Sequence, residues 1–412
     1  MIEWTDTPQQ ASFRRTVREF IRDRFPAAYT PDRTTEFSLE PEDAPGYNWA
    51  ADRRSADPVR RAAAQQWAEA LAQQGWIAPH WPREYGGAGL GVLDEFILHE
   101  ELMRAGAPTV NGIGAFLLGP TLLVHGTTEQ RRAHLPAISS GKIAWAQGFS
   151  EPDAGSDLAG LRTRAERRGD HYVIHGQKIW TSLAQHADWL FALVRTDPDA
   201  PKHRGLTFLM IDLAAPGVTV RPIVDMRGAA PFAEVFFDGA RTPLANRVGE
   251  ENRGWYVAMS TLEFERSGIG STVRYERVLA RLIDYLRSDE ASRFRRRDWR
   301  STVRLEVARR YVETRVLRSL ARYNAALQAA GQPSACAASI NQLFSAELHQ
   351  RLARTGADAF GAYASLWRRD GAPLEADFTH ECFDAVAHTF LAGSSEIQRN
   401  VIATHGLGLP RS

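Results

Sequence analysis

Residues 189–194 read Trp-Leu-Phe-Ala-Leu-Val, and residues 206–211 read Leu-Thr-Phe-Leu-Met-Ile. Both are short apolar runs rich in aromatic and β-branched side chains, a composition typical of buried β-strands. Comparable runs at 172–174, 218–220 and 234–237 are separated by turns that contain Gly, Asp or Pro, with no ten-residue helical pattern between them. Strands joined by such brief turns predict an antiparallel barrel or sandwich, in preference to a doubly wound sheet.

Helical patterns flank this β-rich segment on both sides. Before it, Phe13, Val17 and Phe20 are spaced to lie on one helix face. After it, long helical patterns cover residues 257–286, 299–328, 335–361 and 383–406. A chain of 412 residues also exceeds the roughly 250–300 residues that one core organises. We therefore predict an α+β protein of three domains: a helical N-terminal domain (1–143), a central antiparallel β-barrel (144–248) and a C-terminal four-helix bundle (249–412).

The composition excludes several classes of function. With 50 Lys+Arg against 49 Asp+Glu, the net charge near +1 provides no field that would attract nucleic acid. No apolar run approaches the 18 residues of a membrane span. Cys336 and Cys382 are too few for a disulfide framework or a CxxC zinc site, so we expect a reduced, cytoplasmic protein with no metal site. The motifs of dinucleotide-binding folds, P-loop enzymes, zinc proteases and serine hydrolases are also missing.

Two polar segments near the start of the β-rich region have the chemistry of a ligand site. Residues 147–160 read Gln-Gly-Phe-Ser-Glu-Pro-Asp-Ala-Gly-Ser-Asp-Leu-Ala-Gly, a turn that presents hydroxyls and backbone N–H groups. Residues 176–182 read Gly-Gln-Lys-Ile-Trp-Thr-Ser and place Trp180 beside two hydroxyls, which suits an aromatic cofactor. The plainer alternatives are a simple polar loop and a core tryptophan.

Together with residues 75–87 (Gly-Trp-Ile-Ala-Pro-His-Trp-Pro-Arg-Glu-Tyr-Gly-Gly) and 393–400 (Gly-Ser-Ser-Glu-Ile-Gln-Arg-Asn), these segments resemble the acyl-CoA dehydrogenase family of flavoproteins. The resemblance extends from about Thr7 to Pro410. It implies that FAD is held between the barrel and the bundle. The family's cofactor-binding positions correspond to Gln147, Phe149, Ser150, Trp180, Ser182, Ser394 and Glu396. The position that contacts the coenzyme A part of the substrate corresponds to Ser156.

The catalytic base of this chain differs from that of many family members. Their base directly precedes the Gly-Thr of the C-terminal motif, where this chain has Ala392; its backbone N–H could still bind the substrate carbonyl. A branch that resembles isovaleryl-CoA, long-chain and actinobacterial steroid side-chain dehydrogenases places a glutamate before an arginine on the first long helix of the bundle. Glu265 and Arg266 match those positions, as base and substrate-binding residue respectively. Glu263 lies about 200° around the helix and cannot share that role. The alternative is a surface glutamate.

The resemblance implies FAD-dependent α,β-dehydrogenation of an acyl thioester, in which Glu265 takes the α-proton and flavin N5 takes the β-hydride. We expect an acyl-CoA or acyl-carrier-protein substrate, and electron-transfer flavoprotein as acceptor. Two glycines, Gly268 and Gly270, suggest space for a branched or bulky acyl group or, more simply, close helix packing.

In many family members, two motifs bind the pyrophosphate of the FAD held by a neighbouring subunit. The corresponding segments of this chain, 274–278 and 358–362, match these motifs poorly. The assembly is therefore predicted to be either a homo-oligomer or an α2β2 oligomer with a related chain. Two other functions remain open: a catalytically weak partner subunit, and a flavin-dependent oxygenase or N-hydroxylase.

Overall fold

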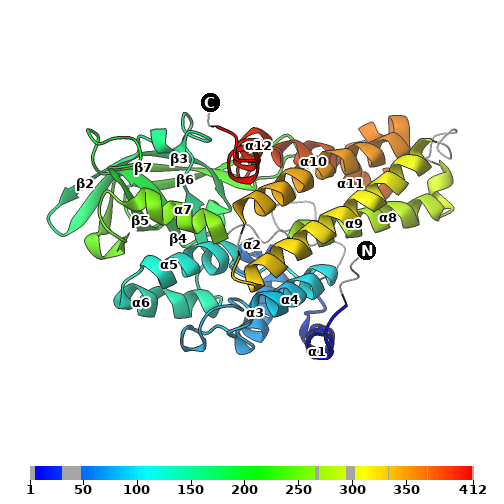
Figure 1. Ribbon diagram of the computed structural model, residues 1–412, viewed down its shortest axis with the longest axis horizontal. Coiled ribbons are helices and arrows are strands. Elements are labelled where there is room, and N and C mark those ends of the chain that lie inside the picture. The colour runs from blue at the N-terminus through cyan, green and yellow to red at the C-terminus, as the bar shows by residue number, and fades with distance from the viewer. Residues whose placement is uncertain are drawn as a thin grey trace. The chain divides into compact units, whose positions relative to one another are not determined.

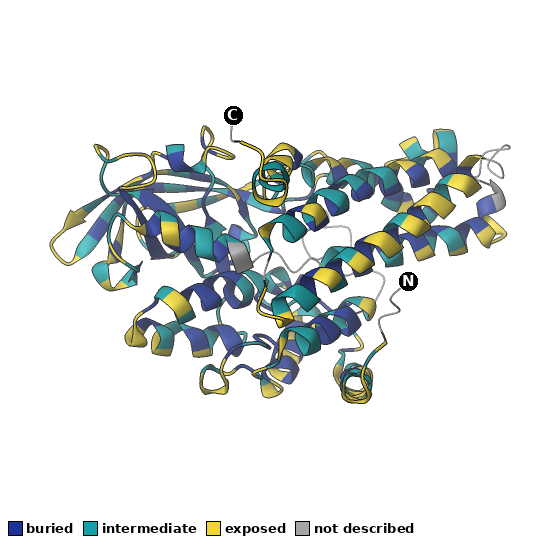
Figure 2. Ribbon diagram, viewed as in Figure 1, coloured by how far each residue is buried: buried dark blue, intermediate teal, exposed yellow. Residues whose placement is uncertain are grey.

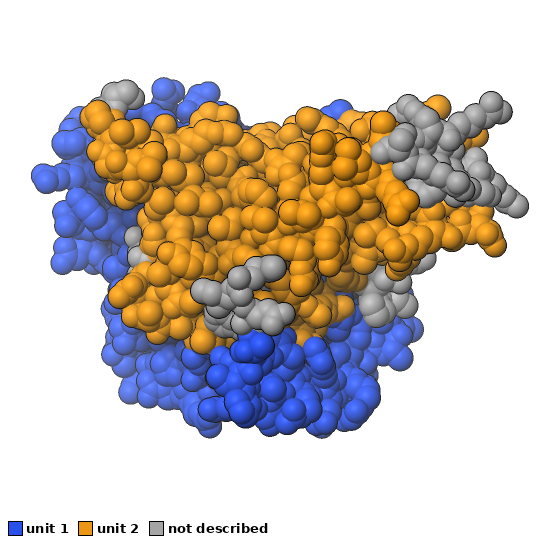
Figure 3. Space-filling model, turned by 45° about the vertical axis from the view of Figure 1, so that its right-hand side comes forward, with its two compact units in different colours: residues 1–91, 105–265 blue, residues 92–104, 266–412 orange. Residues whose placement is uncertain are grey.

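A computed structural model describes residues 5–29, 48–264, 269–293, 302–332, 334–368 and 370–410. Its contacts divide the chain into two compact units, coloured separately in Figure 3. The first consists of residues 1–91 and 105–265, and the second of residues 92–104 and 266–412. We describe each unit by itself.

The first unit begins with helices packed around aromatic side chains. Its α-helices before the sheet are α1 (Pro8–Arg24), α2 (Trp49–Asp52), α3 (Pro58–Gln73), α5 (Gly119–His125) and α6 (Thr128–Ser139). The buried Trp67 of α3 has the rings of Phe20 and Phe25 at 5.9 and 5.2 Å, and its indole N–H donates to Pro108 O at 3.0 Å. Thr7 caps α1 through its side chain, which accepts from the backbone N–H of Gln10.

The centre of the first unit is an eight-stranded sheet. Its strands are β1 (Trp145–Gly148), β2 (Arg164–Arg168), β3 (His171–Ser182), β4 (Trp189–Arg195), β5 (Leu206–Asp212), β6 (Val218–Ile223), β7 (Phe232–Pro243) and β8 (Arg247–Val248). They follow the order β6-β7-β3-β2-β4-β5-β8, and β1 pairs with β4. Leu190, Ala192, Leu209 and Ile211 lie in its buried core, as the apolar runs predict.

The prediction of a central β-domain is confirmed, with a sheet that is mixed rather than wholly antiparallel. Five of the strand pairings are antiparallel, whereas β1–β4 and β2–β4 are parallel. The parallel pairings arise because the chain leaves β1 through a long loop and returns to its side only after β2 and β3. A parallel pair needs such a long crossover, which the spacing of apolar runs does not reveal.

Helix α7 (Gly254–Phe264) also belongs to the first unit, where it packs against β5 and α5. Two polar contacts hold it to α5. The buried hydroxyls of Thr261 and Thr121 are hydrogen-bonded at 2.8 Å, and the His125 ring lies 3.0 Å from the Ser260 hydroxyl. These contacts fix the helix that ends just before residue 265.

The second unit is built from long helices: α4 (Val92–Arg104), α8 (Ile269–Arg287), α9 (Thr302–Ala329), α10 (Ala335–Phe360), α11 (Asp377–Ala387) and α12 (Ser395–Val401). Figure 2 shows buried and exposed positions alternating along them, as expected for amphipathic helices. Tyr275, Leu317 and Leu348 share one buried cluster, which joins α8, α9 and α10.

One predicted helix is divided in the structure. Residues 383–406 form the end of α11 and then α12, separated by a loop in which Ala392 and Gly393 have φ of 51° and 89°. Left-handed residues end a helix. Gly393 permits this conformation without cost, whereas Ala392 does not, so the break is only partly encoded in the local sequence.

Candidate functional site

The first polar segment begins on β1. Phe149 follows this strand and is buried, with its ring perpendicular to Phe191 and Phe208 at 5.7 and 6.1 Å. Gln147 is partly buried on β1, and its amide nitrogen is shielded from water with no hydrogen-bond partner in the described part of the chain. A buried donor without an acceptor is costly, so this amide is available to a bound ligand.

The two polar segments are joined by hydrogen bonds. The Ile179 N–H donates to Ser150 O at 3.0 Å, and the ammonium of Lys178 donates to Phe149 O at 3.1 Å. Lys178 also donates to Glu151 Oε1 at 2.7 Å. Ser150 itself is partly buried. The loop after β1 is thereby fastened to β3.

Glu151 accepts several of the hydrogen bonds that hold this loop in place. Its carboxylate also accepts from the backbone N–H groups of Arg162 and Thr163, at 2.6 and 2.9 Å. Burial acts to raise the pKa of Glu151, but Lys178 and these hydrogen bonds outweigh it and hold that pKa below its ordinary value. Burial lowers the pKa of Lys178 to about 8, against the opposing effect of Glu151. This pair was not predicted from the sequence; the scarcity of lysine, with only three in the chain, was the available signal.

Trp180 presents its ring to solvent. A register shift between Lys178 and Thr181 interrupts the pairing of β3 with β7, and Trp180 between them has a φ of 58°. Its side chain is 54% exposed, with its edge against Phe232 at 6.0 Å. Irregular, strained backbone of this kind is often found beside functional sites, where it redirects a side chain. The alternative interpretation of Trp180 as a buried core residue is therefore wrong.

The residues around Trp180 fit a flat, polar aromatic group. Ser182 ends β3 opposite Phe232, and the neighbouring Thr181 hydroxyl is buried without a partner among the residues described. With the unpaired Gln147 amide on β1, a strand that contacts β3, this edge of the unit combines a stacking surface with unused hydrogen-bonding groups. Such a combination matches the isoalloxazine ring of a flavin. Ser156 lies farther along the loop and is exposed.

In the second unit, the predicted residues lie in the loop between α11 and α12. Ala392 is exposed, and its carbonyl accepts from the side-chain amide of Gln398 at 3.1 Å. The Ser394 hydroxyl accepts from the Ile397 N–H at 3.3 Å and so caps α12. Glu396 is exposed in the first turn of that helix, where backbone and Ser394 hydrogen bonds lower its pKa.

A pocket of about 510 Å³ opens beside this loop and includes Glu396. Its walls come from α10 and the segment from α11 to α12, and are formed by Glu347, Gln350, Arg351, Arg354, Thr389, Phe390, Ser395, Glu396 and Arg399. Three arginines against two glutamates make the lining polar with a small excess of positive charge. The charge is largely compensated, because Glu347 pairs with both Arg351 and Arg399.

The predicted base, Glu265, and its neighbour Arg266 lie outside the described residues. The structure therefore does not test their roles. Arg274 on α8 donates to Glu381 and Asp384, each at 3.0 Å. Burial acts to lower the pKa of Arg274, but the two carboxylates raise it above its ordinary value.

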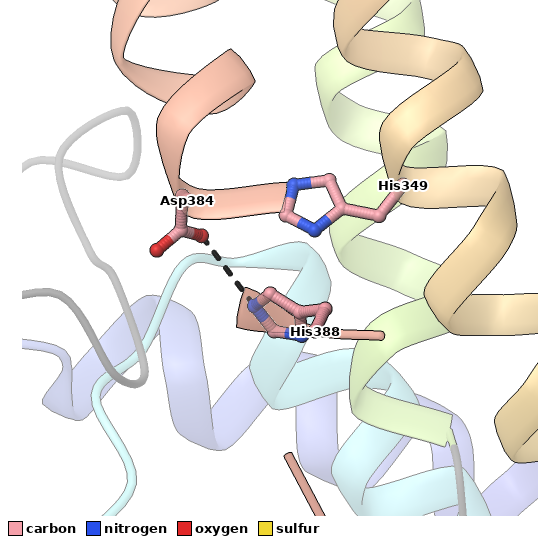
Figure 4. Close-up of side chains that lie close together, drawn as sticks. All are labelled: His349, Asp384 and His388. Atoms are coloured by element: carbon pink, nitrogen blue, oxygen red, sulfur yellow. Dashed lines mark ion pairs between the residues drawn. The ribbon is translucent and has the colours of Figure 1, made fainter. Parts of the chain in front are cut away.

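Arg274 is part of a partly buried polar cluster that was not predicted from the sequence. It also contains His349 on α10 and His388, just after α11, and Figure 4 shows both rings close to Asp384. His349 contacts Glu381, and burial lowers the pKa of His349. Glu381, Asp384 and His388 are spaced at i, i+3 and i+7, which places them on one helix face. This spacing was the feature of the sequence from which the cluster could have been predicted.

Comparison with known proteins gives matches along nearly the whole chain. Residues 47–142, 146–240 and 252–407 match the N-terminal, middle and C-terminal domains of acyl-CoA dehydrogenase. Acyl-CoA dehydrogenase IpdE1 of Mycobacterium tuberculosis is 41% identical over 349 residues, which cover 84% of this chain and 88% of the relative.

Two solved structures are similar over their full length. The steroid acyl-CoA dehydrogenase Tcur3481-Tcur3483 superposes with a TM-score of 0.81 at 29% identity, covering 99% of each chain. The ChsE4-ChsE5 complex from Mycobacterium tuberculosis gives a TM-score of 0.79 at 33% identity, covering 100% of each chain. In the part of this chain that the structure describes, no helix is both long and apolar enough to cross a membrane.

Proposed function

The chain belongs to the acyl-CoA dehydrogenase family, and from that premise we propose that it introduces an α,β double bond into an acyl-CoA with FAD as its cofactor. Members of this family are flavoproteins. The observation that carries the proposal is the exposed Trp180, held beside a strand whose Gln147 amide has no partner among the described residues. Bound FAD would supply the acceptor for the hydride removed from the substrate, and with it for the two electrons of the oxidation.

We assign the cofactor contacts to Gln147, Phe149, Ser150, Trp180 and Ser182. Trp180 stacks on the ring, and the amide and hydroxyls bond its polar edge. Lys178 and Glu151 hold the loop in place for this purpose, because they join it to β3. In the second unit, we assign Ser394 and Glu396 to the cofactor as well, and Ser156 of the first unit to the coenzyme A part of the substrate.

Glu265 is the proposed base. Its position follows directly on α7, which the Thr261–Thr121 and Ser260–His125 contacts hold against α5. A carboxylate with a pKa of about 4 removes a thioester α-proton only where the enolate is stabilised by hydrogen bonds. We assign one such bond to the backbone N–H of Ala392 and place Arg266 near the substrate. Ala392 itself has no side chain that could accept the proton.

We propose a bulky acyl group as the substrate, such as a steroid side chain. The similar Tcur3481-Tcur3483 structure is described as a steroid acyl-CoA dehydrogenase, which supports this choice. We keep electron-transfer flavoprotein as the proposed electron acceptor. The proposal of a cytoplasmic protein rests on the two cysteines, Cys336 and Cys382, which are both free.

We also propose an α2β2 assembly with a related chain. The similar ChsE4-ChsE5 structure is a complex of two proteins. Arg274, at the position where the family's arginine reaches a neighbouring cofactor, is engaged by two carboxylates of its own bundle. An arginine bound within its own bundle does not contact the cofactor of a neighbouring subunit. A related chain would then have to provide that contact. Purification of the chain alone with one tightly bound FAD per monomer would contradict this assembly.

The Glu265→Gln variant tests the catalytic proposal. Loss of a general base costs roughly 10²–10⁴-fold in rate, whereas the amide preserves the size of the side chain. We expect that loss in anaerobic flavin bleaching by a steroid side-chain acyl-CoA, with the visible flavin spectrum unchanged. Glu263→Gln is the matched control, because the helical pattern of the sequence predicts that residues 263 and 265 point about 200° apart. Turnover above a few per cent of wild type in Glu265→Gln would refute the assignment.

A catalytically weak partner subunit is the second candidate function, favoured by the sequestered Arg274. Such a subunit would leave the rate unchanged in Glu265→Gln when it is assembled with its partner. The same assay therefore distinguishes the two functions.

A further inference from the structure

The polar cluster of the second unit brings three potential metal ligands together. His349 on α10, Asp384 on α11 and His388 each offer one donor atom, and these atoms lie within 4.8 Å of one another. The spacing of Asp384 and His388, four residues apart, places both side chains on the same side of α11. Figure 4 shows the carboxylate and the two rings converging on a common space.

His349 is oriented as a ligand would be. Its Nε2 is hydrogen-bonded to the carboxylate of Glu381. Because an ionised carboxylate only accepts, this nitrogen carries the hydrogen and Nδ1 carries the lone pair. A histidine whose other N–H donates to a carboxylate is the arrangement found in most metal-bound histidines.

The second nitrogen of His349 has no hydrogen-bond partner in the described part of the chain. The side chain is 1% exposed, and its Nδ1 is buried without a hydrogen bond from any residue that the structure describes. Figure 4 shows one nitrogen of this ring on the side that faces His388. A buried acceptor left without a donor costs about 1–3 kcal/mol. A cation placed between the two rings would remove that cost.

The charges and distances of the cluster suit a divalent ion. The carboxylates of Glu381 and Asp384 both contact the Arg274 guanidinium, so the two histidines lie beside two acidic side chains. The His388 Nε2 lies 3.5 Å from Asp384 Oδ2. That is long for a hydrogen bond, but close to the separation of about 3.3 Å between two ligands that each lie about 2.0 Å from a tetrahedral ion.

We propose that His349 Nδ1, His388 Nε2 and the Asp384 carboxylate bind a divalent transition-metal ion of the Zn²⁺ class, with Glu381 orienting His349. Imidazole and carboxylate ligands in this number are typical of zinc sites that keep one position for water. The ion would link α10 to the end of α11 and so stabilise the bundle. None of its ligands is among the residues proposed for catalysis, and the proposal differs from the sequence-based expectation of no metal site.

The test uses the purified protein after treatment with a chelator. Equilibrium dialysis against Zn²⁺, followed by elemental analysis, should give one zinc per chain. His388→Gln should lower the affinity at least tenfold, because it removes a ligand while keeping a polar side chain. His405→Gln is the matched control, since His405 is an exposed histidine of the same unit, and it should bind zinc as the wild type does.

Thermal unfolding provides a second measurement. Zn²⁺ should raise the midpoint of the wild type and of His405→Gln, but not that of His388→Gln. If His388→Gln does not fold, Asp384→Asn takes its place in both measurements. Substoichiometric zinc in the wild type, or equal binding by the ligand variant and His405→Gln, would overturn the proposal.

Discussion

Two charged groups, one in each unit, differ in their burial and in how their charges are paired. Beneath the β1 loop, the single positive charge of Lys178 meets the single negative charge of Glu151; both side chains are buried, and both oxygens of that carboxylate accept backbone N–H groups. In the bundle the charged side chains are partly exposed, Arg274 donates to the carboxylates of Glu381 and Asp384, and His349 contacts Glu381 as well. A balanced and fully bonded pair fixes one loop geometry, whereas a cluster of two carboxylates and two histidines retains the capacity to take up a cation.

Breaking the balanced pair should have the largest effect on stability. Lys178→Met leaves the Glu151 carboxylate buried without its partner, which typically costs about 3–5 kcal/mol of unfolding free energy. We expect that loss in urea unfolding, together with loss of the flavin. The control is Lys202→Met, because Lys202 and Asp157 form an exposed pair worth at most about 1 kcal/mol.

The double variant Lys178→Met/Glu151→Gln should recover most of this loss. The glutamine removes the buried charge but keeps an oxygen that can accept from Arg162 and Thr163. A Lys178→Met protein that unfolds at the same urea concentration as the wild type would show that the pair does not fix the loop.

Removing Arg274 from the bundle cluster should cost less unfolding free energy than removing Lys178. Arg274→Met leaves the Glu381 and Asp384 carboxylates without their guanidinium partner, but both are partly exposed to water, so we expect a loss of about 2–3 kcal/mol in urea unfolding. Arg354→Met is the control, since Arg354 is exposed and donates to Gln350 on its own helix. Equal unfolding midpoints for Arg274→Met and Arg354→Met would contradict this interpretation.

The stability that the two groups provide should also differ in its response to alkaline pH. We expect this effect to be smaller than those of the Lys178 and Arg274 variants. Because the pKa of Lys178 is lowered to about 8 in the folded protein, the unfolded chain binds more protons than the folded one between about pH 8 and 10.5. The contribution of Lys178 to stability therefore rises across that interval, by roughly 1–3 kcal/mol. Urea unfolding at pH 7.5 and 10 should show this rise in the wild type relative to the double variant. Equal changes in both proteins would count against it.

The acid response has the same sign, because stability again rises with pH, and it involves both groups. Arg274 and His349 hold the pKa of Glu381 below its ordinary value, against the effect of burial, and the pKa of Glu151 is lowered as well. Stability from these carboxylates is present above their ordinary pKa and is lost as the pH falls below it. Acid unfolding alone therefore does not separate the two regions, and the alkaline range is the discriminating one.

Much of the fold could be predicted from the sequence. The apolar runs at 189–194 and 206–211 form β4 and β5, and the helical patterns flank the sheet as expected. Residues with particular chemistry, such as Trp180 and Gln147, could also be selected from their segments. These properties are local, because the period of apolar side chains sets the secondary structure and shows which face of it is buried.

Only the tertiary structure decided which elements cover one another and which charged groups meet. Arg274 and Glu381 are 107 positions apart, and the parallel pairing of β1 with β4 spans the intervening strands. The left-handed conformations of Trp180 and Ala392 likewise depend on their surroundings, since neither residue favours them. A local sequence pattern indicates that a side chain is buried, but it does not identify the residues that the side chain contacts. Those contacts determine its ionisation, its orientation and its function.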